Sequence, residues 1–475
     1  MIDAIVLFLG LVLSWAFGTA VVASVYARSI AGVPRSWVVG CGWFVGIFAT
    51  TLVMRALSIA GVGWSRASIA APLILVPMLV AWLARSRVRA SLEGLPRRLG
   101  AALGGAHLAG WQRIAWRLLI GWLAVRFALL LAEVWWLPLY PWDAWTQWST
   151  KARVWFELGR IVPFVNIPEW LDSRTSNAYL DAAPHYPGTA PLFQVWSAVL
   201  IGRWDDALVN LPWWFTGVAF CIALYGAMRR LAFEPLLALV GAGIVTSLPI
   251  LNVHIALAGY ADLPLAAFLT LGATSALLAI RTRSPGEAAL AAVLLGACVV
   301  IKNPGKVWLI VLVPALITAA MPRRGLQLAG AAFAAAALAI LWLARSGVNV
   351  LGYQLSPQFA MPWNALFDAY FSFANWNLLW YCAVGTVALA WRQLLSRDVA
   401  PWSCLIAAGL MFLFVGFAFT NAGAWVEDQS TVNRATLHLA PLVVLWMFVA
   451  LRAWRRTTAT PVPGPQVPAG LTPSA

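Results

Sequence analysis

Hydrophobic residues run along this chain in long blocks, and short polar clusters separate the blocks. Most blocks hold about 17 to 24 residues, enough for a helix to cross a hydrocarbon layer of about 30 Å. The pattern therefore predicts an all-α, polytopic integral membrane protein with about thirteen transmembrane helices and a long external loop carrying surface helices. The predicted spans are residues 2–26, 36–58, 66–84, 116–138, 206–228, 236–253, 262–280, 287–301, 304–320, 326–343, 376–391, 401–420 and 434–451.

Composition supports the same class. The 475 residues are 62% hydrophobic and 10% charged, with a mean hydropathy of +0.81. Soluble domains average roughly 45–50% apolar and 25% charged residues, so this chain could not cover its surface in water. All five cysteines fall inside apolar blocks, where they indicate neither a disulfide nor a metal site.

The net charge of +15 is best explained by the topology of the chain in the membrane. The basic residues form short clusters between blocks instead of one basic face, which disfavours nucleic acid as a partner. With the amino terminus outside, the clusters face the cytoplasm, whereas the opposite orientation would place nearly all of them outside. The clusters are Arg28/Arg35, Arg85/Arg87/Arg89/Arg97/Arg98, Arg229/Arg230, Arg281/Arg283, Arg323/Arg324, Arg392/Arg397 and Arg452/Arg455/Arg456.

Unusual polar residues gather on the predicted external face, first in the stretch YPWDAWTQWSTKARVW at 140–155. Gln147 and Lys151 follow Asp143 along one stripe of a helical pattern, which predicts a helix on the membrane surface. Asp143 either caps that helix or supplies a reactive carboxylate. Later in the loop, prolines and a glycine set a rigid turn that presents His185 and Tyr186.

Further polar residues flank the later spans. Asp262 begins a span, where taken alone it is best interpreted as a helix cap. Lys302 and Lys306 flank a Pro-Gly break in VVIKNPGKVWLIV, where they either snorkel to the interface or line a cavity. Arg434 lies at the mouth of the last span with His438 one turn deeper on the same face. The predicted external face therefore carries a carboxylate, imidazoles, ammonium groups and a guanidinium. Their presence on one face favours a functional site there.

The order of these motifs resembles the GT-C superfamily of membrane glycosyltransferases that use polyprenyl-phosphate sugars, especially the protein O-mannosyltransferase and lipid A aminoarabinose transferase branch. Asp143 resembles the essential acidic residue of that family's first large external loop. The HYP turn, with His185 and Tyr186, resembles a later turn of the same loop. The likeness covers roughly residues 115 to 450, although about three additional spans precede the acidic loop here.

Three later landmarks extend the resemblance. Asp262 resembles the acidic residue at the outer start of a following helix. The KNPG turn, with Lys302 and Gly305, resembles the family's Lys-x-x-Gly turn, and Arg434 resembles a late external arginine. The resemblance divides the chain into additional amino-terminal helices with a basic cytoplasmic loop (1–115), a GT-C-like catalytic domain (116–456) including the external loop 139–205, and a disordered Pro-rich tail (457–475).

The resemblance implies transfer of a hexose or pentose from a polyprenyl-phosphate donor to a glycan, lipid or protein acceptor, with inversion at the anomeric carbon. Asp143 would be the general base, and Lys302 and Arg434 would bind the donor phosphate. Its other implied substrate-binding residues are Lys151, His185, Tyr186 and Asp262.

The implied location is a bacterial inner (cytoplasmic) membrane, with the active site facing outside. No cofactor is implied, because cationic side chains can take the place of a metal beside the phosphate and the sequence lacks a Cys/His set with zinc spacing. A divalent metal is left open.

Three alternatives stay open. A polytopic transporter or a lipid-linked glycan flippase would also need broken helices and charges near water-filled cavities. An O-antigen ligase or polymerase works on similar lipids but carries its arginines and histidines in a later large loop. A structural scaffold would have no need for Asp262, Lys302 and Arg434 beside one leaflet.

Overall fold

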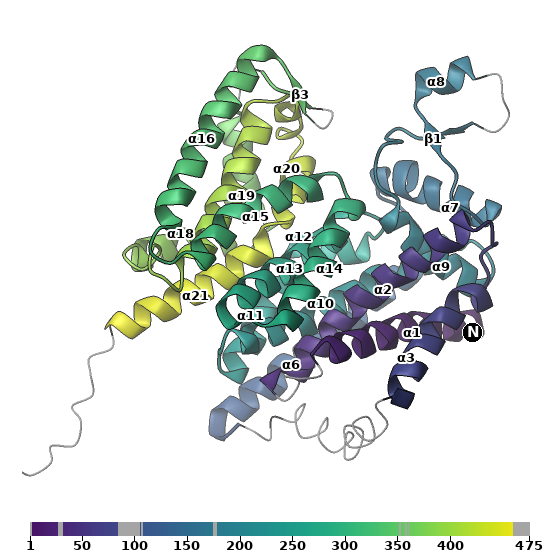
Figure 1. Cartoon of the computed structure of the whole chain (residues 1–475), viewed down its shortest axis with the longest axis horizontal. Coiled ribbons are helices and arrows are strands. Elements are labelled where there is room, and N and C mark those ends of the chain that lie inside the picture. Colours follow the sequence, from purple (N-terminus) through teal and green to yellow (C-terminus); the bar gives the residue numbers. More distant parts are fainter. Residues whose placement is uncertain are drawn as a thin grey trace, which may run out of the picture.

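The computed structural model describes residues 2–26, 32–83, 105, 108–173, 178–350, 353–356, 359 and 361–458 (Figure 1). Arg28, the basic run at 85–98 and residues 459–475 of the predicted tail lie outside the described residues. The last helix continues to Thr458, which is two residues into the segment predicted as tail.

Helices coincide with all thirteen predicted apolar blocks. They are α1 (Ile2–Val25), α2 (Arg35–Ile59), α3 (Arg66–Leu83), α6 (Gly110–Trp136), α10 (Leu211–Arg230), α11 (Pro235–Thr246), α12 (Pro249–Ala256), α13 (Asp262–Thr282), α14 (Pro285–Ile301), α15 (Pro304–Ala320), α16 (Gly325–Ser346), α18 (Leu379–Ala390), α19 (Ala400–Ala418), α20 (Ser430–Leu437) and α21 (Ala440–Thr458).

The number of membrane crossings is smaller than the number of helices. Among the described residues, seven helices are long and apolar enough to cross a membrane, or up to nine if the bent pairs α11–α12 and α20–α21 each count as one span. The prediction of thirteen crossings is therefore not confirmed. Helices α14 and α15 have 17 residues each and α18 has 12. At 1.5 Å per residue, α18 rises only about 18 Å, well short of the hydrocarbon thickness.

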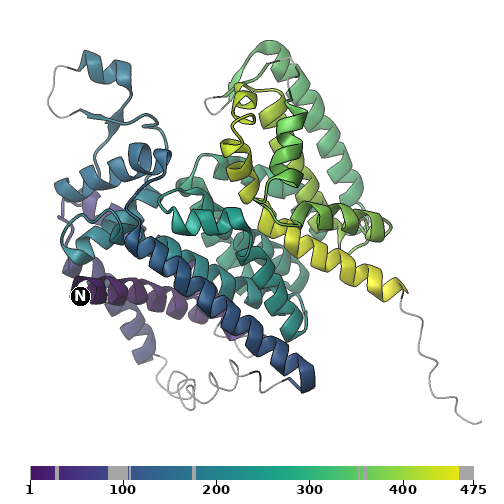
Figure 2. The ribbon, with the colours of Figure 1, turned by 180° about the vertical axis from the view of Figure 1, so that it is seen from behind.

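Two ion pairs join residues that were predicted to lie on the same side of the membrane. Near the chain start, Asp3 forms an ion pair with Arg203 at 3.6 Å, and both were predicted to be external. At the predicted cytoplasmic ends, Arg230 pairs with Glu287 at 2.5 Å. The amino terminus and the projecting part of the external loop lie at one end of the molecule, and α21 ends at the other (Figures 1 and 2).

The amino-terminal helices are part of the main body. Glycine lets α1 and α2 cross closely, since a Cβ on Gly46 would lie 1.8 Å from the carbonyl oxygen of Ser14. Helix α10 approaches α2 in the same way, since a Cβ on Gly226 would lie 2.4 Å from the backbone nitrogen of Trp37. Close backbone approach through small residues is typical of helix packing in membranes.

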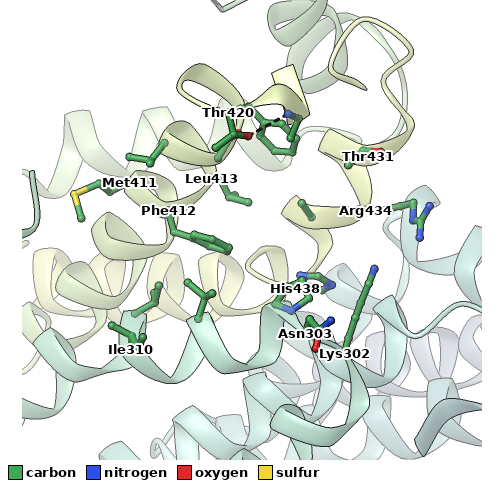
Figure 3. Close-up of a pocket in the computed structure, with 18 of the residues that line it drawn as sticks. Lys302, Asn303, Ile310, Met411, Phe412, Leu413, Thr420, Thr431, Arg434 and His438 are labelled. Carbon is green, nitrogen blue, oxygen red and sulfur yellow. Dashed lines mark hydrogen bonds between the residues drawn. The ribbon is translucent and has the colours of Figure 1, made fainter. Parts of the chain in front are cut away.

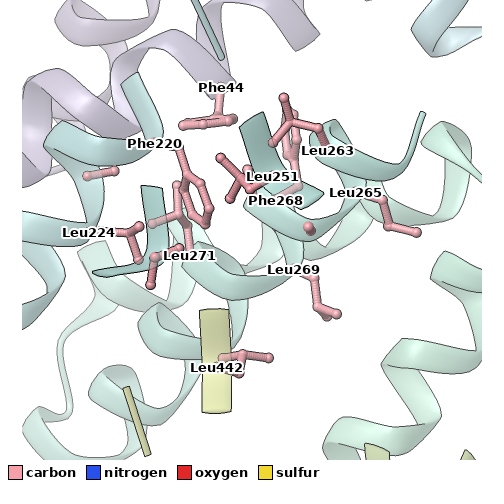
Figure 4. Close-up of a cluster of buried hydrophobic side chains, with 14 of the residues drawn as sticks. Phe44, Phe220, Leu224, Leu251, Leu263, Leu265, Phe268, Leu269, Leu271 and Leu442 are labelled. Carbon is pink, nitrogen blue, oxygen red and sulfur yellow. The ribbon is translucent and has the colours of Figure 1, made fainter. Parts of the chain in front are cut away.

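A core of aromatic and aliphatic side chains holds α13 in place (Figure 4). Phe44 of α2 lies edge-on to Phe268 of α13, with ring centroids 5.2 Å apart, and also contacts Phe220 of α10 at 6.4 Å. Leu442 of α21 belongs to the same buried cluster. Helix α13 is thus fixed between the amino-terminal and carboxy-terminal helices, and its first residue is Asp262.

The predicted external loop folds into short elements. They are the π-helical turn η2 (Ala144–Trp148), α7 (Ser149–Leu158), β1 (Phe164–Val165), α8 (Ile167–Asp172), β2 (Tyr179–Leu180), α9 (Thr189–Ile201) and η3 (Leu208–Asn210), with β1 and β2 parallel.

A second predicted external region contains the antiparallel strands β3 (Asn349–Val350) and β4 (Tyr353–Gln354). After these strands come α17 (Trp363–Phe367) and the π-helical turn η4 (Asp368–Ser372). The 3-10 turn η5 (Asn421–Trp425) follows α19, in a separate predicted external segment.

Candidate functional site

Four charged residues from distant parts of the chain meet in one cluster. Lys302 Nζ donates to Asp262 Oδ1 at 2.6 Å, and Arg434 Nε donates to Asp262 Oδ2 at 3.2 Å. Arg434 Nη1 also donates to Asp143 Oδ2 at 2.5 Å. One guanidinium therefore joins the carboxylate of the external loop to the carboxylate at the start of α13.

Asp262 is the centre of this cluster rather than a helix cap. Its side chain makes no capping hydrogen bond, because both carboxylate oxygens accept hydrogen bonds from other elements. The interpretation as a cap is therefore wrong. Asp143 likewise makes no side-chain capping bond to the turn that follows it.

Breaks between helices position the two cations. Lys302 adopts an extended conformation (φ −154°, ψ 145°) between α14 and α15, which points its side chain away from both helix axes. Gly305 allows α15 to start against α14, since a Cβ there would lie 1.9 Å from the Cys298 carbonyl oxygen. Arg434 lies on α20, which meets α21 at a 51° bend.

Burial differs across the cluster. The side chains of Asp262 and Lys302 are 1% and 10% exposed, whereas those of Arg434 and Asp143 are 18% and 27% exposed. A buried charge is stable only when it is paired and hydrogen-bonded, and the Lys302 ammonium meets this condition through its contact with Asp262. Asp143 is therefore the more exposed of the two carboxylates.

Two aromatic residues and one histidine contact the cluster directly or through a hydrogen bond. Arg434 Cζ lies 4.1 Å from the centre of the Tyr260 ring, which is a cation–π contact. Trp308 Nε1 donates to His438 Nδ1 at 3.2 Å, and His438 Nε2 lies 3.0 Å from Asp262 Oδ1. Because an indole nitrogen can only donate, His438 carries its hydrogen on Nε2 and donates it to Asp262.

The cluster lies at one end of a cavity of about 880 Å³ (Figure 3). Away from the charges, the walls are aliphatic and aromatic, and α15, α16 and α19 supply them. They include Val307, Ile310, Val311, Pro314, Phe333, Ala336, Ile340, Leu343, Met411, Phe412 and Val415. The cavity therefore combines a charged end with a long apolar part.

The structure brings five of the seven predicted site residues to this cavity. They are Asp143, Tyr186, Asp262, Lys302 and Arg434. His185 is exposed and is not among the lining residues, although its ring lies 5.2 Å from that of Tyr186.

Lys151 is buried in the loop instead of facing the cavity. Its ammonium pairs with Asp181 at 3.3 Å and donates to the Ala183 carbonyl at 2.7 Å. Burial lowers the pKa of Lys151, although the charge of Asp181 opposes this effect. The sequence placed Lys151 on the stripe of Asp143, but the π-helical turn between them has i→i+5 bonding and shifts the register.

Sequence reasoning missed part of the site. His438 was visible one turn after Arg434 but was not assigned to it. Tyr260 and Trp308 carried no usable signal, because aromatic residues recur throughout this chain and their roles depend on hydrogen bonds and ring contacts between distant helices.

Comparison with family models, curated proteins and solved structures gives no match. Within the described residues, no group of three or more His, Cys, Asp or Glu side chains is arranged to hold a metal ion. The chemistry of the site is therefore what points to a function.

Proposed function

We propose that this protein is a membrane glycosyltransferase that uses a polyprenyl-phosphate sugar as its donor. The observation that carries the proposal is the cavity, which joins a cluster of two carboxylates and two cations to an apolar chamber between α15, α16 and α19. An amphipathic ligand with a phosphate head and a hydrocarbon tail matches both parts. The sequence resemblance to the GT-C superfamily supports the same choice.

In this proposal Arg434 acts as a switch between two partners. It binds Asp143 and Asp262 together when no donor is present. A donor phosphate would draw Arg434 and Lys302 toward itself, since charge-assisted contacts to phosphate are strong. Asp143 would then lose its cationic partner, which leaves both of its oxygens available to the acceptor group.

The reaction follows from this arrangement. The acceptor O–H or N–H gives its proton to Asp143 as the acceptor atom attacks the anomeric carbon. The bond from that carbon to the phosphate oxygen breaks, and the electron pair leaves with the polyprenyl phosphate, which Lys302 and Arg434 stabilise. A single displacement inverts the anomeric configuration. The donor and acceptor would meet on the external side of a bacterial inner membrane.

Comparative mass spectrometry of cell-envelope glycans tests this function. Cells lacking the chain are complemented with the wild type, with Asp143→Asn or with Asp172→Asn. Asp172 is the matched control, because it is an exposed carboxylate of the same loop outside the cavity. Loss of one sugar modification with Asp143→Asn alone, at equal protein abundance, supports the proposal. Glycans that are identical with and without the chain refute it.

A second experiment tests the apolar chamber. Ala336→Trp adds a large side chain to the cavity wall on α16, whereas Leu338→Trp changes an exposed position of the same helix. We expect Ala336→Trp to raise the KM for a long-chain donor but not for a short-chain analogue. Equal effects on both donors would place the hydrocarbon tail elsewhere.

A further inference from the structure

Arg126 lies on α6, near the middle of the predicted span 116–138. Ten residues separate it from the outer end of the helix at Trp136. At 1.5 Å per residue this is about 15 Å, half of a hydrocarbon layer of about 30 Å. Trp122, one turn earlier, lies 5.5 Å from the Arg126 guanidinium and is 43% exposed.

The partners of Arg126 are all neutral. Its Nε donates to Asn252 Oδ1 at 3.0 Å, and its Nη2 donates to the Ser247 carbonyl at 3.5 Å. Asn377 Nδ2 donates to the same carbonyl at 3.3 Å. These groups surround the break where α11 and α12 meet at 65°. Arg126 and Asn377 both donate to the Ser247 carbonyl oxygen, so the guanidinium and the amide lie close together.

This charge differs from two other cations of the helix bundle. Lys302 and Arg230 each pair with a carboxylate at 2.5–2.6 Å. Within the part of the chain that the structure describes, no carboxylate lies within ion-pair distance of Arg126. Neutral amides and carbonyls satisfy hydrogen bonds but leave the net charge in place, and an uncompensated charge at this depth is costly.

The site is also open to the surroundings of the protein. Arg126 is half-buried and Asn377 is exposed, so both polar groups reach the outer surface of the helix bundle. We infer that Arg126, with Asn377 beside it, binds the phosphate of an anionic membrane lipid whose head group is drawn in at the α11–α12 break. The lipid supplies the negative charge that the protein does not, and its acyl chains pack along α6 beside Trp122.

The test uses the full chain in lipid nanodiscs and does not depend on enzymatic activity. Native mass spectrometry measures retention of phosphatidylglycerol against phosphatidylcholine, whose head group carries no net charge. Arg126→Gln keeps an amide donor and removes the charge, and we expect it to weaken phosphatidylglycerol binding by about tenfold. Arg126→Lys keeps the charge and should retain most of the binding. Arg203→Gln is the control, because Arg203 is already paired with Asp205 at 2.7 Å.

Several outcomes would overturn the inference. Equal phosphatidylglycerol retention by Arg126→Gln and the wild type would make Arg126 a structural support of the helix break. Equal thermal stabilisation of the wild type by the two lipids would do the same, even if Arg126→Gln fails to fold. Stabilisation by inorganic phosphate in phosphatidylcholine discs, matching that by phosphatidylglycerol, would assign a soluble anion instead of a lipid.

Discussion

The Asp262–Lys302 pair offers a direct test of how the site is held together. Asp262→Asn keeps the shape of the side chain but removes the charge that faces the Lys302 ammonium at 2.6 Å. Lys302 is then a buried cation without its carboxylate, while Arg434 keeps Asp143 as a partner. Breaking a buried pair in this way costs about 3–5 kcal/mol of stability.

A compensating change should restore part of this loss. In Asp262→Asn/Lys302→Met both buried charges are gone, and methionine fills the space of the lysine stem. We expect the double variant to be more stable than Asp262→Asn alone, with a coupling energy of roughly 1–3 kcal/mol. Asp262→Asn/Lys306→Met is the matched control, because Lys306 is exposed and bonds only Asn303 among the described residues.

The assay is reversible unfolding of the purified variants in mixed micelles, followed by the fluorescence of tryptophans such as Trp308. If the stability losses caused by Asp262→Asn and by Lys302→Met simply add in the double variant, the reasoning is refuted. Residues that act independently show no coupling energy. A coupling of the same size with Lys306→Met would show that the effect is one of overall charge instead of the buried pair.

Two further predictions concern the supports of the site. Gly305→Ala should prevent correct packing of α15 on α14, because its Cβ would lie 1.9 Å from the Cys298 carbonyl oxygen. The control Gly296→Ala should fold normally, because nothing lies within 4 Å of the added Cβ. Yields of monodisperse protein measure both effects. Lys151→Met should destabilise the external loop by about 3–5 kcal/mol, because Asp181 is left buried and unpaired. Adding Asp181→Leu should restore resistance to proteolysis in that loop, and continued cleavage would contradict this role.

The sequence by itself determined the class of protein and the boundaries of most helices. Apolar blocks of this length form helices in a membrane because every backbone N–H and C=O must be bonded within the segment. The same local logic marked the polar residues that interrupt the blocks, so Asp143, Lys302 and Arg434 could be chosen for the site. Local pattern overestimated the length of α18, which begins at Leu379 instead of residue 376, because helix boundaries depend on packing.

Tertiary structure decided which partners these residues meet. Asp262 was interpreted as a cap, because its local sequence contains only the start of a helix, whereas its three partners lie on segments far away in the chain. The π-helical turn after Asp143 moved Lys151 out of the site and into its pair with Asp181. Charge pairing acts through space at a few ångströms, so contacts between helices that are distant in sequence fix it, and the order of residues along one helix does not.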